Sequence, residues 1–189
     1  IYYNALRYND YAVARNSLYK MMAINPSNLA LADTLAMLYL DQNQYSSALI
    51  LTNDILSVNA ADQFAMEVNG FCYEQLGFKQ EALTRYESLH LATNRIDILY
   101  KIAFLQFQLN KLAEATASAD IVLQDESSSG LKISFPIDQT RVQEVPMHAS
   151  IYNLKGLIAQ AQEQKEEAIG HFEKALELAP EFSVAQQNL

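Results

Sequence analysis

The sequence predicts an all-α fold: an α-solenoid, or superhelix, of about five stacked helix–turn–helix units with a short irregular or β-hairpin insertion between units four and five. The first observation is a set of alanines that recur every 33 or 34 residues, with a last step of 53 that equals 34 plus an insertion of 19. These alanines are Ala14, Ala48, Ala82, Ala115 and Ala168. A fixed period of this length is typical of proteins that stack copies of one small helical unit.

The second observation is that other columns of residues keep the same register. Twelve residues before the last four alanines, the chain carries only small residues: Ala36, Gly70, Ala103 and Gly156. Four residues after the alanines come Leu18, Thr52, Tyr86, Ala119 and Phe172, and seven residues after come Met21, Ile55, Leu89, Val122 and Ala175. A spacing of three to four residues places these side chains on one helix face, and small residues let two helices approach closely.

The columns divide the chain into repeat units that follow one another in a single array. Residues 1–28 form a partial first unit, followed by units 29–62, 63–95, 96–125 and, after an insertion at 126–147, 148–182. Residues 183–189 start a capping helix or a further unit. Short breaker segments, such as 41–44 and 76–79, separate the two helices of a unit.

The insertion breaks the helical pattern. Residues 127–130 stop the preceding helix, and Ile133 and Phe135 then alternate with polar residues, which is the period of a strand. Pro136 and Pro146 limit how far any strand can run. Two interpretations remain open: the insertion is a binding loop, or it is a local cover that packs Ile133 and Phe135 over otherwise exposed helix.

The repeated columns resemble the tetratricopeptide repeat, a 34-residue helix–turn–helix unit with small residues where its helices cross and a proline near its end. The match is best in the last unit, where six family positions are filled by Gly156, Ala159, Ala168, Phe172, Ala175 and Pro180. The early tryptophan of the family is missing, because the chain contains no Trp. Its position holds Ala32, Met66, Leu99 and Tyr152.

Composition narrows the classes of partner. The formal net charge of −9, from 13 basic and 22 acidic residues, disfavours a nucleic acid and favours a basic or neutral partner, although acidity also keeps an extended surface soluble. No apolar run approaches a membrane span. The chain starts at Ile1 inside its first unit, so we expect either a removed targeting segment or an excised fragment. Many Gln and Asn and few Lys favour an exported, periplasmic bacterial protein, with a cytoplasmic one as the alternative.

The sequence lacks the residue spacings that are typical of catalytic and metal sites. The glycines are isolated, and His90, His148 and His171 have no second His or Cys at metal-ligand spacing. Cys72 is alone, and we expect a buried thiol rather than a redox centre. We therefore expect no catalytic residue, no metal, no cofactor and no enzymatic activity.

The resemblance implies a concave groove lined by the second, fifth, ninth and twelfth residues of each unit. The groove residues we single out are Asp33, Met37, Phe64, Glu67, Phe71, Glu74, Asp97, Tyr100, Phe104, Phe107, Asn153 and Leu157. The set contains aromatic and acidic side chains and no Lys or Arg, which suits an apolar segment that carries basic residues. The alternative is that Phe71 and Phe104 are core residues between neighbouring helices.

The resulting prediction is a non-catalytic protein-interaction scaffold that binds a peptide or protein segment in this groove. We expect Phe107→Ala and Glu74→Lys to weaken a partner without unfolding the array. Two alternatives remain: a structural component of an envelope or cell-surface complex that self-assembles through the array ends into a homo-oligomer, or the non-catalytic segment of a larger protein.

Overall fold

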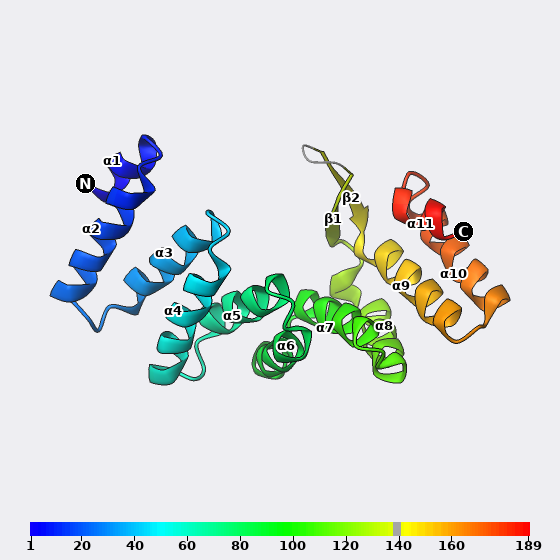
Figure 1. Ribbon diagram of the computed structural model, residues 1–189. Coiled ribbons are helices and arrows are strands. Elements are labelled where there is room, and N and C mark those ends of the chain that lie inside the picture. Colours follow the sequence, from blue (N-terminus) through cyan, green and yellow to red (C-terminus); the bar gives the residue numbers. More distant parts are fainter. Residues whose placement is uncertain (138–140) are drawn as a thin grey trace. The chain divides into compact units, whose positions relative to one another are not determined.

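The computed structural model describes residues 1–137 and 141–189, so residues 138–140 of the predicted insertion lie outside the described part of the chain. The described residues form eleven α-helices and one two-stranded hairpin (Figure 1). They divide into two compact units, residues 1–92 (unit 1) and residues 93–189 (unit 2). The predicted helical fold with a hairpin before the last helices is confirmed. The organisation as one continuous array stays a prediction.

Unit 1 consists of three helix pairs. Its helices are α1 (Tyr2–Arg7), α2 (Tyr11–Ile24), α3 (Leu29–Leu40), α4 (Tyr45–Val58), α5 (Gln63–Gln75) and α6 (Lys79–Thr93). Two of them have an aspartate cap: Asp10 accepts a hydrogen bond from the Val13 amide, and Asp62 accepts one from the Ala65 amide, at 3.1 and 2.9 Å. These bonds satisfy amides that have no partner inside the helix.

Unit 2 contains two helix pairs, the hairpin and a short last helix. Its elements are α7 (Ile96–Gln108), α8 (Leu112–Gln124), the 3₁₀ turn η1 (Glu126–Ser128), β1 (Lys132–Pro136), β2 (Val142–Pro146), α9 (Met147–Ala161), α10 (Lys165–Leu178) and α11 (Ser183–Asn188). The predicted fifth repeat, residues 148–182, therefore corresponds to α9 and α10. The predicted last helix corresponds to α11.

The turn inside each pair repeats the register of the alanines. The residue five positions before each of the recurring alanines has a positive φ in all five pairs, namely Asn9, Asn43, Gly77, Asn110 and Glu163. The next amide then donates to a carbonyl five residues back, as from Gln44 to Tyr39 at 2.8 Å and from Gln164 to Ala159 at 2.9 Å. This left-handed ending satisfies the last carbonyls of the first helix and reverses the chain.

The small-residue column marks where the helices of a pair cross. A Cβ on Gly70 would lie 2.8 Å from Cε1 of Tyr86, and a Cβ on Gly156 would lie 2.3 Å from Cε1 of Phe172. Both aromatic rings belong to the column four residues after the alanines and are buried. The glycines therefore provide the space for a large ring on the partner helix, and this explains two of the predicted columns.

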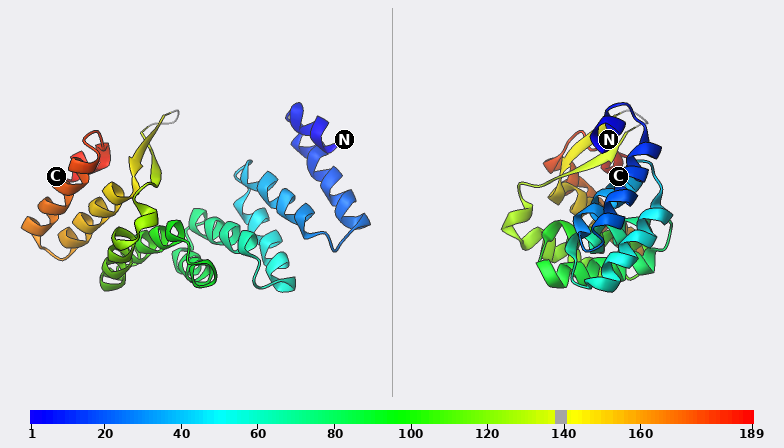
Figure 2. Two further views of the ribbon diagram at one scale, coloured as in Figure 1. Left: turned by 180° about the vertical axis from the view of Figure 1, so that it is seen from behind. Right: turned by 90° about the vertical axis from the view of Figure 1, so that its left-hand side faces the viewer.

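The hairpin packs on the last helices of unit 2. The two strands are antiparallel, with Ile133 opposite Val145 and Phe135 opposite Gln143. The ring of Phe135 lies 4.9 Å from that of Phe182, just before α11, and the Gln143 side chain accepts from the Ser183 amide at 3.3 Å. Figure 2 shows the hairpin beside α9 and α11. These contacts support the interpretation of the insertion as a local cover.

Candidate functional site

The predicted groove residues are divided between the two units. Asp33, Met37, Phe64, Glu67, Phe71 and Glu74 lie on α3 and α5 of unit 1, and Asp97, Tyr100, Phe104, Phe107, Asn153 and Leu157 lie on α7 and α9 of unit 2. We call the first set the unit 1 face and the second set the unit 2 face. Only Asn153 is buried. Each face is described by itself.

On the unit 1 face, Asp33 has an unsatisfied carboxylate. Its Oδ1 atom is buried and has no hydrogen-bond partner. Burial raises the pKa of Asp33, and the negative charge of Asp62 raises it further. One turn along α3, the side chain of Met37 is 45 % exposed. A buried acceptor beside an exposed apolar side chain is suited to a donor that carries a hydrocarbon stem.

The aromatic residues of the unit 1 face are partly engaged in packing. Phe71 meets Tyr45 edge to face, with ring centroids 5.9 Å apart, and Phe64 packs against the core cluster around Ala48 and Cys72. Glu74 accepts a hydrogen bond from the buried Tyr86 hydroxyl at 3.3 Å. Phe71 therefore combines the two roles that the sequence left open, because it contacts a neighbouring helix and remains partly exposed.

On the unit 2 face, the acidic residue Asp97 forms an ion pair with Arg95. Nη2 of Arg95 lies 2.5 Å from Oδ2 of Asp97. Burial acts to raise the pKa of Asp97, but the hydrogen bond and positive charge of Arg95 outweigh burial, so the pKa is lowered. Asp97 is thus neutralised within the chain, whereas Asp33 is not.

Other predicted residues of the unit 2 face hold adjacent helices together. The Tyr100 hydroxyl and the buried Ser150 hydroxyl are hydrogen-bonded at 2.7 Å, and the Tyr100 ring lies 4.8 Å from Phe104. Asn153 is 2 % exposed and accepts from the Asn188 amide group of α11 at 2.8 Å. Tyr100 and Asn153 therefore join α7 to α9 and α9 to α11.

The two remaining residues of the unit 2 face are partly exposed. Phe107 lies in the last turn of α7 and is half-buried. Leu157 packs on the cluster of Ala159, Ala168 and Phe172. Tyr100 and Phe104 contact each other, so Phe107 is the aromatic residue of this face that is most available to a partner.

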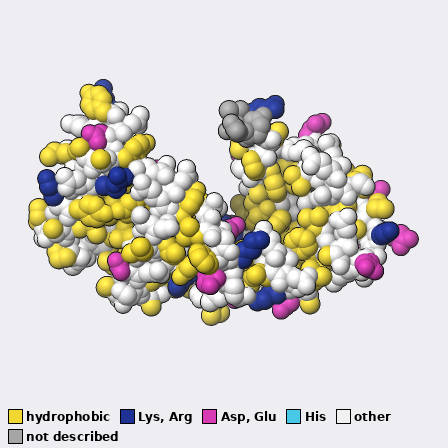
Figure 3. Space-filling view, in the orientation of Figure 1, with side chains coloured by type: hydrophobic (Ala, Val, Ile, Leu, Met, Phe, Trp, Pro, Cys, Tyr) yellow, Lys and Arg dark blue, Asp and Glu magenta, His cyan; other side chains and the backbone are white. Residues whose placement is uncertain are grey.

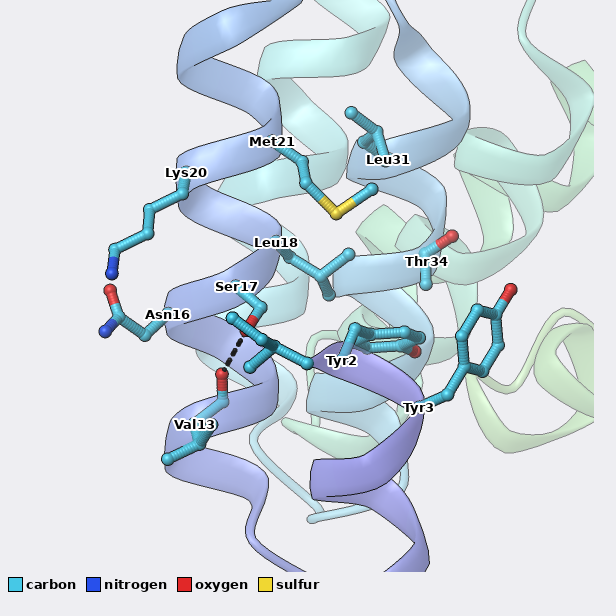
Figure 4. Close-up of a pocket in the computed structure, with 11 residues that line it drawn as sticks. Tyr2, Tyr3, Val13, Asn16, Ser17, Leu18, Lys20, Met21, Leu31 and Thr34 are labelled. Carbon is cyan, nitrogen blue, oxygen red and sulfur yellow. Dashed lines mark hydrogen bonds between the residues drawn. The ribbon is translucent and has the colours of Figure 1, made fainter.

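A pocket on unit 1 was not predicted from the sequence. It encloses about 530 Å³ between α1, α2 and α3, and its lining residues are Ile1, Tyr2, Tyr3, Val13, Asn16, Ser17, Leu18, Lys20, Met21, Leu31 and Thr34. Figure 4 shows the side chains of Met21, Leu18 and Leu31 converging between α2 and α3, with Lys20 and Asn16 at the outer edge. In Figure 3, hydrophobic side chains cover much of the visible surface of unit 1.

One serine–histidine pair has the spacing of a nucleophile and its base. Oγ of Ser128 lies 2.6 Å from Nε2 of His148 and 2.6 Å from the carbonyl oxygen of Val122. Ser128 is fully buried, so no substrate reaches its hydroxyl. The pair instead connects η1 to the start of α9.

Other chemical groups are accounted for by packing. Cys72 is buried, and burial raises the pKa of its thiol to about 11, so it stays protonated. Among residues 1–137 and 141–189, no three His, Cys, Asp or Glu side chains lie close enough to hold a metal ion. In the same residues, no helix has the length and apolar character needed to cross a membrane.

Paired helices, left-handed turns in register and crossing points made of small residues define an α-helical repeat protein. Residues 149–182 match the family model of the tetratricopeptide repeat, so the chain contains such a repeat, and the predicted resemblance is confirmed. The match covers the fifth predicted unit, where the family positions are best filled.

Solved structures of tetratricopeptide-repeat proteins share the fold. A crystal structure of MamA is 16 % identical with a TM-score of 0.74, covering 94 % of this chain and 93 % of that one. MamA from Desulfovibrio magneticus RS-1 is 12 % identical with a TM-score of 0.74, covering 96 % and 93 %. A tetratricopeptide repeat protein from Parabacteroides merdae ATCC 43184 is 21 % identical with a TM-score of 0.62, covering 100 % and 94 %. No curated protein matches the sequence.

Proposed function

We propose that this chain is a non-catalytic protein-interaction scaffold and that the unit 1 face binds an extended protein segment in which basic and apolar residues alternate. The observation that carries the proposal is the contrast between two aspartates on first helices. Asp97 is paired with Arg95, whereas a buried oxygen of Asp33 has no hydrogen-bond partner. Asp33 as a whole is partly exposed, and a lysine or arginine from a bound segment would compensate the charge of its carboxylate.

The surroundings of Asp33 support the same kind of partner. Met37 beside it is exposed, and the half-buried Phe71 lies on the neighbouring first helix. Apolar contacts of this type provide most of the binding energy of an interface, while the charge selects the partner. Helices already held by their own core also leave little ordering to be done on the scaffold side.

A selection experiment tests the proposal without knowledge of the partner. Random 12-residue peptides displayed on phage are selected on the folded chain, and we expect enrichment of peptides with Lys or Arg next to aliphatic or aromatic residues. A synthetic peptide with the most enriched sequence should bind the Asp33→Asn variant about fivefold more weakly than the wild type, a loss of about 1 kcal/mol in binding free energy. Glu74→Lys should weaken it too, with a thermal melt to show that the loss of the Tyr86 hydrogen bond has not unfolded the protein.

The matched control is Asp54→Asn, which makes the same change at an exposed position on the second helix α4. It should bind as the wild type does. Enrichment of acidic peptides, or equal affinity for Asp33→Asn and the wild type, would contradict the assignment of the unit 1 face. Phe107→Ala tests the unit 2 face in the same way, and a loss of binding only there would move the site to that unit.

A further inference from the structure

We propose that His171 is an acid-sensitive contact that holds α10 against α9 while its imidazole is neutral, so that a fall from neutral to mildly acidic pH loosens this helix pair of unit 2. The inference goes beyond the proposed function, because it concerns a response of the fold to pH. The residues involved lie on α8, α9 and α10, and none of them belongs to the unit 1 face or the unit 2 face.

The imidazole of His171 is enclosed between the two helices. Its side chain is 14 % exposed, and its ring is stacked on that of Tyr152 of α9, with centroids 6.2 Å apart and an angle of 29° between the planes. The Nδ1 atom is buried and has no hydrogen-bond partner among the described residues. A charged imidazole carries a proton on both nitrogens. Protonation would therefore leave a charged N–H group buried without an acceptor, which is costly.

Two lysines lie around the same ring of Tyr152. Nζ of Lys174, three residues after His171 on α10, lies 5.6 Å from the centre of that ring. Lys155, one turn after Tyr152 on α9, has its Nζ atom 2.5 Å from Oδ1 of Asp120 on α8. A proton on His171 would thus add a positive charge where two lysines already gather, and it would disfavour the packing of α10 on α9.

Among the described residues, one acidic side chain opposes this effect. Oε1 of Glu167, one turn before His171 on α10, lies 3.6 Å from Nε2. The side chain of Glu167 is 57 % exposed, so water screens its charge. Burial, together with the positive charges of Lys155 and Lys174, outweighs Glu167, and the pKa of His171 is lowered from its usual value of 6.5.

This direction determines how stability changes with pH. Because the pKa of His171 is lower in the folded chain than in the unfolded chain, the unfolded chain takes up the proton first as pH falls. The free energy of unfolding should therefore decrease below pH 6.5 and stop decreasing below the folded pKa. The loss should be concentrated in α10, where the imidazole makes its contacts.

An NMR titration tests the first step, because the chain has three histidines, His90, His148 and His171. Their imidazole signals can be assigned by changing each one to Gln. We expect the signal of His171 to titrate below pH 6.5. Hydrogen exchange of the α10 amides tests the second step. After correction for intrinsic exchange rates, these amides should exchange at least about twofold faster at pH 5.5 than at pH 7.

Three variants connect the two steps. His171→Gln keeps a neutral polar side chain and should remove the faster exchange at pH 5.5. Lys174→Gln removes one positive charge from an exposed position and should raise the pKa of His171. Lys165→Gln is the matched control, since it removes a lysine from another exposed position of α10 and should leave the titration of His171 unchanged.

Three results would overturn the proposal. The first is a His171 signal that titrates at or above pH 6.5. The second is faster exchange of α10 at pH 5.5 that persists in His171→Gln, because the change would then come from other groups. The third is an unchanged His171 titration in Lys174→Gln. The first and third results decide the matter even if His171→Gln does not fold.

Discussion

Unit 1 and unit 2 are built from the same kind of helix pair, but the first pair of unit 1 and the last pair of unit 2 differ in how much of their apolar surface is buried. In unit 2 the last pair is covered, because Phe182 and Ala185 around α11 and Val145 of the hairpin are buried against α9 and α10. In unit 1 the first pair leaves Met21 and Tyr3 exposed beside a pocket. The same repeated position is therefore buried or exposed according to the segments packed against it, and not according to its own helix alone.

The two units also differ in whether an acidic side chain on the first helix of a pair has a partner within the chain. Asp97 in unit 2 is paired with Arg95, and its pKa is lowered. Asp33 in unit 1 has a buried oxygen without a partner, and its pKa is raised. Unit 1 therefore has the acidic side chain without a partner, and this is why the proposed binding face lies on unit 1.

The largest expected effect tests the covered end. Phe182→Ala removes a fully buried ring that contacts Phe135, and it should lower the free energy of unfolding by about 3–4 kcal/mol. Met21→Ala in unit 1 should lower it by less, about 1 kcal/mol, because the side chain is 44 % exposed and less apolar contact is lost. Urea unfolding followed by circular dichroism measures both. Equal losses would show that the two ends are not different.

The next effect tests the crossing points that the units share. Gly156→Ala should lower the free energy of unfolding by about 2 kcal/mol, and Gly70→Ala by about 1 kcal/mol, because the new Cβ meets a closer ring in unit 2. Gly170→Ala is the control, since nothing lies within 4 Å of its Cβ, and it should raise stability by about 0.5–1 kcal/mol. Stabilisation by Gly156→Ala would contradict the packing described here.

A third prediction concerns the polar bond between α7 and α9. Tyr100→Phe leaves the buried Ser150 hydroxyl without this partner and should lower the free energy of unfolding by about 1–2 kcal/mol. Tyr3→Phe in unit 1 removes the same group from an 83 % exposed residue and should change nothing measurable. If Tyr3→Phe were the more destabilising change, the contrast between the two units would be wrong.

The smallest effect is the pH dependence of the two aspartates. A raised pKa in the folded state means that ionised Asp33 disfavours folding, so Asp33→Asn should stabilise the protein at pH 7. That gain should shrink as pH falls through the folded pKa and vanish below the usual value of 3.8, where both states are protonated. Urea unfolding between pH 3 and pH 7 measures the change.

Asp97→Asn should behave in the opposite way. A lowered pKa means that ionised Asp97 favours folding, so the substitution should destabilise the protein at pH 7. The loss should shrink as pH falls below 3.8 through the folded pKa. The same sign for both substitutions would remove the electrostatic contrast on which the proposed function rests.

The sequence alone determined the repeat, because its cause is local. The period of the alanines, the small residues at positions 70 and 156 and the breakers between paired helices reflect backbone preferences and nearest-neighbour packing within about 34 residues. The hairpin could also be predicted from its alternation and its prolines. The candidate face was only partly predictable, since Asn153 and Tyr100 occupy the expected positions but are used to hold neighbouring helices.

Only the tertiary structure decided which repeated positions are covered. Met21 and Ile55 occupy the same column, and nothing in their own helices shows that one is exposed and the other buried. The two aspartates differ in this respect, because Arg95 lies only two residues before Asp97, whereas the buried oxygen of Asp33 without a partner is visible only in the structure. Burial is a property of surroundings assembled from several segments, so it appears only when those segments are placed in space.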